Sequence, residues 1–167
     1  RGLGDVYKRQ IKACEMRDAG LPAKEIAEQI ALLREKVHTT FILNTLDYLS
    51  RGGRCSAVTA FGANLLSIKP SIEMVDGALE VGKKYRGKIE TVYGQYIRDQ
   101  LSDPDKLDLS RAFLSHSGGG ISEETLQAMK KEILRCAPFQ EVQIIRAGCT
   151  ISAHCGPKTA TVMFMEK

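Results

Sequence analysis

The stretch IKPSIEMVDGALEV, residues 68–81, constrains the fold more than any other part of the chain. Two apolar-rich arms flank Asp76-Gly77. An Asp-Gly pair between two such arms is the strongest short-range signal for a β-hairpin, because glycine accepts the positive φ that a tight two-residue turn requires. The chain is therefore predicted to contain a sheet with at least one pair of adjacent antiparallel strands.

The rest of the pattern alternates between helical and extended segments without a strict βαβ order. Residues 22–37 repeat apolar side chains at Ile26, Ile30, Leu33 and Val37, which indicates an amphipathic helix that follows a helix end at 11–19. Helices are also expected at 46–56 (interrupted at Gly52-Gly53), 57–66, 86–101 and from Ser122 to about Ala137, and a polar loop at 102–106. Strands are expected at 39–45, 107–116, 141–148, 150–152 and 159–165. We therefore predict an α+β fold, a two-layer α/β arrangement in which helices pack on a mixed, largely antiparallel sheet.

Composition excludes several classes of protein. The 167 residues suffice for a buried core, and the net charge of +4 is too small to indicate a polyanion partner. No apolar run approaches the roughly 20 residues of a membrane span. The five cysteines contain no CxxC pair, and their odd number argues against a complete disulfide framework, so we expect a reducing cytoplasm.

The first ten residues, RGLGDVYKRQ, fit nothing in the pattern that follows, and no initiator methionine precedes them. We interpret Arg1 to Gln10 as adaptor-derived sequence and set them outside the fold. On this interpretation the chain is a fragment whose amino-terminal part is missing.

Two short stretches carry residues suited to chemistry. In YLSRGGRCS, residues 48–56, Gly52-Gly53 separate Arg51 from Arg54, and guanidinium groups beside a glycine turn suit a carboxylate or phosphate. The alternative is a surface turn with solvated arginines. No GxxxxGK[ST] or GxGxxG motif supports a nucleotide site, and SHSGGG, residues 115–120, resembles a phosphate loop without its lysine.

The second stretch is TISAHCGPKTATVMFM, residues 150–165, in which small residues surround His154. This setting suggests a histidine that faces a ligand, although a structural histidine is the alternative. Cys155 could act as a nucleophile, but adjacent residues on an extended chain point to opposite faces, so transfer of its proton to His154 is poorly arranged. Cys149, His154 and Cys155 lack the ligand spacing of a zinc site, so no metal is expected.

A third hypothesis assigns partner or nucleic-acid binding to the basic run GKKYRGK, residues 82–88. Its lysines and Arg86 would normally form a solvated face. Tyr85, Tyr93 and Tyr96 are too few to form a platform for stacking bases, so nucleic acid is not expected as a partner.

The order FILNTLDYLSRGGRCS, LLSIKP, DGALEVGKKYRGK and GCTISAHCGP resembles the DegV family of bacterial fatty-acid-binding proteins. The resemblance extends from about Ala19 to the end of the chain. His154-Cys155-Gly156-Pro157 matches the His-x-Gly-Pro ending of the family. Lys158 departs from the usual glycine, and Cys55 from a common isoleucine.

The resemblance implies a protein that buries a long-chain fatty acid between two domains. Residues 11–37 would be the last helices of a truncated amino-terminal domain, and residues 38–167 the carboxy-terminal domain. His154 and Arg54 would serve the fatty-acid carboxylate, and Arg86 would lie on the rim, where a partner fatty-acid kinase docks. The resemblance also implies that the binding protein is not itself the catalyst; no catalytic residue and no cofactor are then expected.

Overall fold

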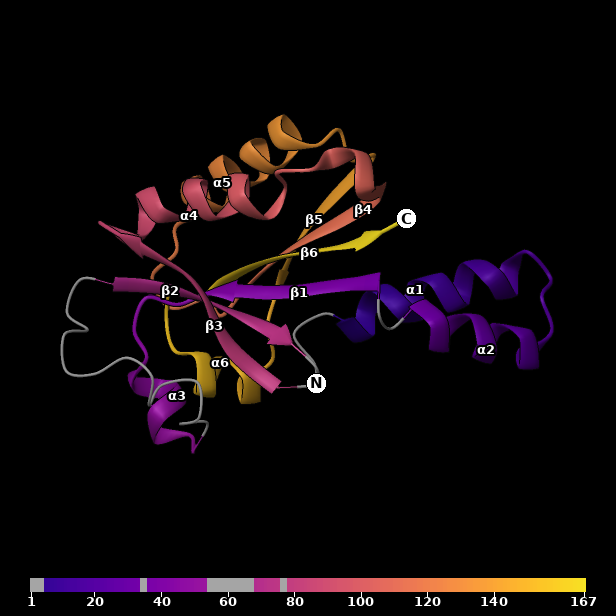
Figure 1. Cartoon of the computed structure of the whole chain (residues 1–167), viewed down its shortest axis with the longest axis horizontal. Coiled ribbons are helices and arrows are strands. Elements are labelled where there is room, and N and C mark those ends of the chain that lie inside the picture. The colour runs from indigo at the N-terminus through magenta and orange to yellow at the C-terminus, as the bar shows by residue number, and fades with distance from the viewer. Residues whose placement is uncertain (1–4, 34–35, 54–67, 76–77) are drawn as a thin grey trace.

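A computed structural model describes residues 5–33, 36–53, 68–75 and 78–167, without the side chains of residues 5–7. Its centre is a six-stranded sheet in the order β3-β2-β1-β6-β4-β5 (Figure 1). The strands are β1 (Val37–Ile42), β2 (Ile68–Val75), β3 (Ala78–Arg86), β4 (Leu107–His116), β5 (Glu141–Arg146) and β6 (Ala160–Glu166). The predicted turn residues Asp76-Gly77, the predicted helix at 57–66 and Arg54 lie outside the described residues.

The pairing of the strands confirms a mixed, largely antiparallel sheet. β2 and β3 pair antiparallel from Val75 opposite Ala78 onward, as the hairpin signal predicts. β1 pairs antiparallel with β2 and with β6, and β6 pairs antiparallel with β4. Among the described strands only β4 and β5 are parallel neighbours. The carboxyl ends of β1, β4 and β5 therefore all lie at the same end of the sheet.

Two amphipathic helices, α4 (Ile89–Gln100) and α5 (Glu123–Cys136), cover one face of the sheet (Figure 1). The buried residues of α4 recur three and four positions apart, which places them on one stripe: Ile89, Val92, Tyr93, Tyr96 and Ile97. The stripe packs on Ile42, Leu114, Val162 and Phe164 of the strands. The Ser122 hydroxyl accepts a hydrogen bond from the Thr125 amide at the start of α5, which confirms the predicted helix cap.

Two short helices, α3 (Asp47–Arg51) and α6 (Cys149–Cys155), lie against the opposite face (Figure 1). They close a second, smaller core around Phe41, Leu43, Leu49, Ile72 and Cys155. Because side chains alternate along a strand, Phe41 faces this core while its neighbour Ile42 faces α4 and α5. β1 thus contributes to both layers.

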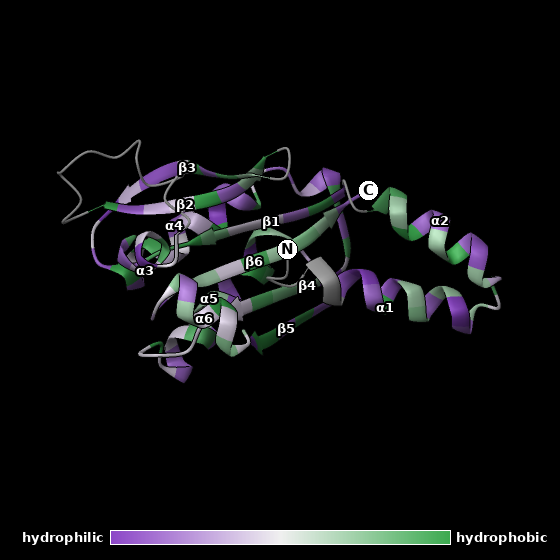
Figure 2. Ribbon diagram, turned by 90° about the horizontal axis from the view of Figure 1, so that it is seen from below, coloured by the Kyte–Doolittle hydropathy of each residue, from purple (hydrophilic) through white to green (hydrophobic). Residues whose placement is uncertain are grey.

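The helices α1 (Asp5–Asp18) and α2 (Ala23–Leu33) project beyond the sheet as an antiparallel hairpin (Figure 2). Two ion pairs join α1 to strand β4. Lys12 of α1 pairs with Asp108 (3.6 Å), and Glu15 of α1 pairs with Arg111 (3.1 Å). No residue of α2 is buried, and Leu32 is 74% exposed. The helix predicted for residues 22–37 ends at Leu33, and Val37 begins β1 instead. The helical part of the predicted stripe, Ile26 and Ile30, is half-buried and faces α1.

Several predicted boundaries are wrong. Thr150–Ser152 is helical, not extended: it lies within α6, where the Gly156 amide bonds back to the Ser152 carbonyl. Two β-branched residues in so short a run do not outweigh the helical hydrogen bonds. Strand β3 continues to Arg86, where a helix was expected, because these residues pair with β2. Pro104–Lys106 form a short 3-10 helix within the expected polar loop.

A buried tyrosine hydroxyl is inserted into the ladder between β1 and β6. The Tyr96 hydroxyl donates to the Thr40 carbonyl (2.9 Å), pairs with the Thr40 hydroxyl (2.6 Å) and accepts from the Val162 amide (3.4 Å). The Thr161 hydroxyl also donates to the Thr40 carbonyl. Burial raises the pKa of Tyr96 to about 12, so the hydroxyl stays protonated and available as a donor.

We expect Tyr96→Phe to lower the free energy of unfolding by about 1–3 kcal/mol, because buried polar groups of Thr40 and Val162 lose a partner. Urea denaturation followed by circular dichroism measures the change. Tyr48→Phe is the matched control: Tyr48 is 38% exposed and its hydroxyl bonds to no described residue, so its effect should stay within about 0.5 kcal/mol. Equal stabilities for the two variants would contradict a structural role for the Tyr96 hydroxyl.

Candidate functional site

The predicted site lies at the end of the sheet where β1, β4 and β5 finish (Figure 1). The chain leaves β1 through Leu43–Leu46 into α3, and it leaves β5 through Ala147 and Gly148 into α6. The glycine-rich residues 117–120 follow β4. Loops at the carboxyl ends of strands are where α/β sheets commonly bind ligands.

Hydrogen bonds from the β4 end fix the segment that carries His154. The Ser117 hydroxyl donates to the Gly156 carbonyl (2.7 Å) and accepts from the Thr159 amide (3.2 Å). The Thr159 hydroxyl donates to the Cys155 carbonyl (2.8 Å). These groups are buried, so they hold the end of α6 in one position relative to β4 and β6.

Lys158, which follows the His-x-Gly-Pro segment, adopts a backbone conformation that suits glycine. Its φ is 60°, in the left-handed region that glycine adopts without strain. Its carbonyl accepts a hydrogen bond from the Tyr93 hydroxyl (2.7 Å), and its ammonium group pairs with Glu90 (2.9 Å). The backbone of this turn is thus held by contacts with α4 while the Lys158 side chain stays near the surface.

The GGR turn and His154, predicted from separate stretches, are brought together by contact between α3 and α6. A Cβ atom on Gly52 would lie 2.5 Å from Nδ1 of His154, so only glycine lets the turn approach the imidazole this closely. Similarly, the Tyr48 ring lies where a side chain on Gly156 would be, 2.3 Å from an ideal Cβ. Gly52 and Gly156 therefore allow α3 and α6 to pack closely against each other.

The His154 imidazole is half-buried on α6, and it forms no hydrogen bond or ion pair within the part of the chain that the structure describes. A satisfied structural histidine would have a polar partner at this depth. The Nδ1 side of the ring lies against Gly52, and the helix that carries it packs on an apolar core. This geometry favours the ligand-facing interpretation over the structural one.

Cys155 is buried, and burial raises the pKa of its thiol to about 11. A catalytic cysteine requires the opposite shift, because the thiolate is the nucleophile. The expectation that His154 and Cys155 lie on an extended segment is wrong, since both belong to α6. On a helix, successive side chains still point in different directions, so the poor arrangement for proton transfer remains.

The other predicted site residues are not brought to His154. Arg54 falls outside the described residues. Arg86 ends the edge strand β3, exposed, without an ion pair to any described residue, whereas Lys83 of the same strand pairs with Asp99 at 2.8 Å. Tyr85, Tyr93 and Tyr96 are all buried and unable to stack on bases.

The sheet face that carries α3 and α6 is apolar well beyond His154. Phe113 on β4 pairs with Met163 on β6, and both point to this face together with Met165 and Phe41. Lys8 of α1 is also buried, and its ammonium group has no hydrogen-bond partner among the described residues. Burial lowers the pKa of Lys8 to about 8, because an unpaired ammonium group is costly to desolvate.

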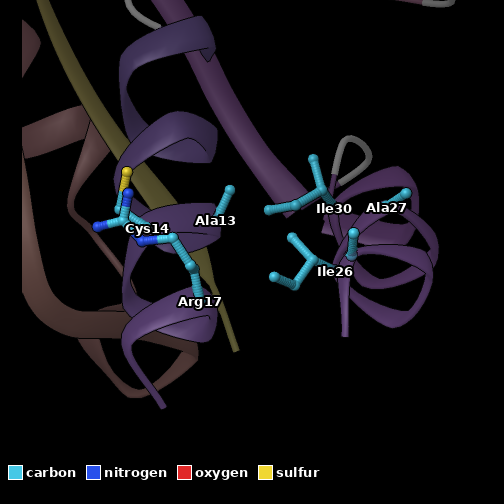
Figure 3. Close-up of a pocket in the computed structure, with 7 residues that line it drawn as sticks. Ala13, Cys14, Arg17, Ile26, Ala27 and Ile30 are labelled. Carbon is cyan, nitrogen blue, oxygen red and sulfur yellow. The ribbon is translucent and has the colours of Figure 1, made fainter. Parts of the chain in front are cut away.

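A groove of about 500 Å³ lies between α1 and α2, away from His154 (Figure 3). Ile26 and Ile30 of α2 point across it toward Ala13 of α1 (Figure 3). Its lining is largely apolar. Arg17 also lines the groove, but its guanidinium group is already bonded to the Asp18 carboxylate (2.7 Å).

In the described residues, no group of three or more His, Cys, Asp or Glu side chains is arranged to hold a metal ion. None of the helices within those residues has the length and apolar character needed to cross a membrane.

Sequence reasoning missed Ser117 and Tyr48, which position the histidine segment. Both contacts join residues far apart in the chain, Ser117 to Gly156 and Tyr48 to Gly156. The only signal available was the glycine at 156, which indicates close approach of another group without naming it.

A comparison with sequence families matches residues 10–167 to a family described as "Uncharacterised protein, DegV family". A DegV domain-containing protein of Clostridium acetobutylicum is 29% identical over 99% of this chain and 56% of its own length. One from Caldanaerobacter subterraneus is 29% identical over 94% of this chain and 55% of its own length. The chain thus spans little more than half the length of these curated relatives.

Solved structures show the same fold. A fatty-acid-binding DegV family protein from Thermus thermophilus matches with a TM-score of 0.79 and 24% identity, over 98% of this chain and 57% of the other. The fatty acid kinase (Fak) B3 protein of Streptococcus pneumoniae, solved loaded with linoleic acid, matches with a TM-score of 0.81 and 22% identity, over 98% and 56%. At these identities the likeness establishes the fold.

We expect Gly52→Ala to displace the His154 imidazole, because the added methyl group would lie 2.5 Å from Nδ1. The His154 Hε1 resonance in proton NMR should shift, while the other two histidines keep theirs. Gly53→Ala is the control: it adds backbone strain at φ 73°, which Gly52 at φ −77° lacks, but it meets no atom within 4 Å. If both variants move the His154 signal equally, a general disturbance of the turn rather than contact with the ring explains the change.

Proposed function

Because this chain belongs to the DegV family, we propose that it binds a long-chain fatty acid with the carboxylate at His154. The observation that carries this proposal is the half-buried imidazole that lacks a described partner at the edge of an apolar sheet face. The acyl chain would lie along that face, over residues such as Phe41, Phe113 and Met163.

The energetics of such a ligand suit this arrangement. Each buried methylene contributes about 0.8 kcal/mol, so a chain of some sixteen carbons binds tightly in an apolar channel. Its carboxylate must keep a hydrogen-bond or charge partner on leaving water, and the imidazole can supply an N–H donor. Arg54 would add a guanidinium group from the same turn that brings Gly52 to His154.

The proposal requires more protein than the 167 residues contain. Residues 11–37 would belong to an amino-terminal domain, and the remainder of that domain would pack on α2, which has no buried residue, and close the acyl channel. Residues 1–10 would not belong to the fold. The unpaired, buried ammonium group of Lys8 supports this assignment, since it is an unfavourable cover for an apolar face.

The protein would act as a carrier rather than as an enzyme, presenting the bound carboxylate to a separate fatty-acid kinase in the bacterial cytoplasm. The raised pKa of the Cys155 thiol opposes the alternative of a cysteine enzyme. A partner-binding module that works through the basic run alone would leave the arrangement at His154 without a role.

We expect His154→Ala to weaken binding of a long-chain fatty acid by about 1–3 kcal/mol when the amino-terminal half is restored, because the buried carboxylate loses a partner. Isothermal titration with palmitate measures the loss. The matching fatty alcohol should bind both proteins alike, since it lacks the charge. His38→Ala is the control, because His38 lies exposed on β1 and pairs with Glu166. Unchanged palmitate affinity in His154→Ala would remove this residue from the site.

We expect Arg86→Ala to leave fatty-acid affinity unchanged and to reduce acyl-phosphate formation with the partner kinase. Arg86 is exposed on an edge strand, and its charge is unpaired among the described residues. Lys83→Ala is the control on the same strand, since Lys83 is already paired with Asp99. Loss of fatty-acid binding in Arg86→Ala, with the kinase reaction of the bound fraction unchanged, would place Arg86 in the ligand site instead.

A further inference from the structure

A second cluster of donors lies on the other side of the same sheet end. His116 and Arg146 are the last residues of the parallel strands β4 and β5, and they stand opposite each other in the ladder. Ala112 and Leu114 of β4, and Val142 and Ile144 of β5, pack toward α4 and α5. By alternation His116 and Arg146 point to that face as well, whereas Ser117 turns toward α6.

The loop that follows β4 wraps around these two side chains. Gly118, Gly119 and Gly120 have φ values of 75°, 59° and 96°, a run that other residues would adopt only with strain. The Arg146 guanidinium group lies against Gly118, 3.2 Å from the position of an added Cβ, and Lys158 lies 3.3 Å from that of Gly120. A side chain at Gly118 would therefore crowd the guanidinium group and require it to shift slightly.

Hydrogen bonding leaves the donors of this cluster free. The Gly118 amide donates to Nδ1 of His116 (3.1 Å), which leaves Nε2 of the neutral ring as the N–H donor. Burial, and then the charge of Arg146, lower the pKa of His116, so the ring stays neutral at physiological pH. Within the described chain, the amides of Gly119 and Gly120 donate to no other group, and Arg146 forms no ion pair.

The nearest acidic residues do not neutralise Arg146. Glu123 and Glu124 begin α5, and the Glu123 carboxylate accepts a hydrogen bond from Gln127 (2.8 Å) rather than from the guanidinium group. Glu90 on α4 pairs with Lys158. Three other arginines have carboxylate partners: Arg98 and Arg135 pair with Glu132, and Arg111 pairs with Glu141. Arg86 of β3, like Arg146, has no such partner among the described residues.

We propose that the loop 118–120, His116 and Arg146 form a binding site for a phosphate-type oxyanion. A guanidinium fork matches two oxygens of a tetrahedral anion, and adjacent backbone amides with an imidazole N–H satisfy the others. The site lies across the sheet from His154, so the argument for it does not rest on the fatty-acid proposal. The ligand is either free phosphate or the phosphoryl group of a small acyl phosphate.

The test uses the 167-residue chain labelled with ¹⁵N, whose glycine amides resonate apart from most others. Inorganic phosphate and acetyl phosphate are titrated separately, and sodium chloride at matched ionic strength controls for screening. We expect saturable shifts of the Gly119 and Gly120 amides. Shifts with both phosphates mean that the phosphoryl group itself is recognised, and shifts with acetyl phosphate alone mean that the acyl group is recognised as well. Equal shifts with chloride would overturn the proposal.

Variants make the result specific to the guanidinium fork. Arg146→Met should weaken phosphate binding by about tenfold or more, the loss expected for a charged hydrogen bond. Arg146→Lys should bind phosphate with an affinity between those of the original chain and Arg146→Met, because lysine keeps the charge but not the planar fork. Arg51→Met, which removes an exposed arginine from α3 on the opposite face, should bind as the original chain does. Arg51→Met as weak as Arg146→Met would show general charge attraction and overturn the site.

Discussion

The pairing of β6 with both β1 and β4 holds this molecule together. β1, β2 and β3 form one group of strands and β4 and β5 another, and β6 is the strand that joins them. β1 and β6 come from opposite parts of the sequence, with Val37 opposite Met165. Closing so long a loop costs conformational entropy before the contacts form, so the ladder depends on strong packing at its centre. The Tyr96 hydroxyl supplies such a centre by satisfying β1 and β6 backbone groups from α4.

The position of His154 follows from this central strand. β6 begins at Ala160, immediately after the turn that ends α6, and Ser117 of β4 bonds to both Gly156 and Thr159. The histidine is therefore fixed through β6 to β4, and through Gly52 to the segment that leaves β1. Contacts from β1, β4 and β6 thus fix the position of one side chain. A ligand contact made by such a residue is preorganised, since little further ordering is required on binding.

The sequence predicted correctly those elements whose formation depends on a few neighbouring residues. The Asp-Gly hairpin, the Ser122 cap and the strand ending at His116 needed only turn and capping rules, and the structure confirms the β2–β3 pairing, the cap and this strand. Thr150–Ser152 was predicted wrongly because strand propensity in three residues is weaker than the hydrogen bonds of a short helix. The contacts that build the site, such as Tyr48 on Gly156, join distant residues and leave no periodic pattern in the sequence. The resemblance to a family, rather than periodicity, connected the GGR turn with His154.

The two proposed sites lie on opposite faces of the sheet, and the short loop after β4 contacts both of them. His116 and Ser117 are consecutive residues, yet the pleat directs the first toward Arg146 and the second toward α6. The Gly118 carbonyl accepts from the Lys158 amide, and Gly119 packs on Pro157, so the loop also contacts the turn that follows His154. An anion held by the loop would therefore restrain the segment that orients the imidazole. Since binding energies at two sites that share such a segment are reciprocally coupled, a fatty acid at His154 would in turn change the affinity of the loop for the anion.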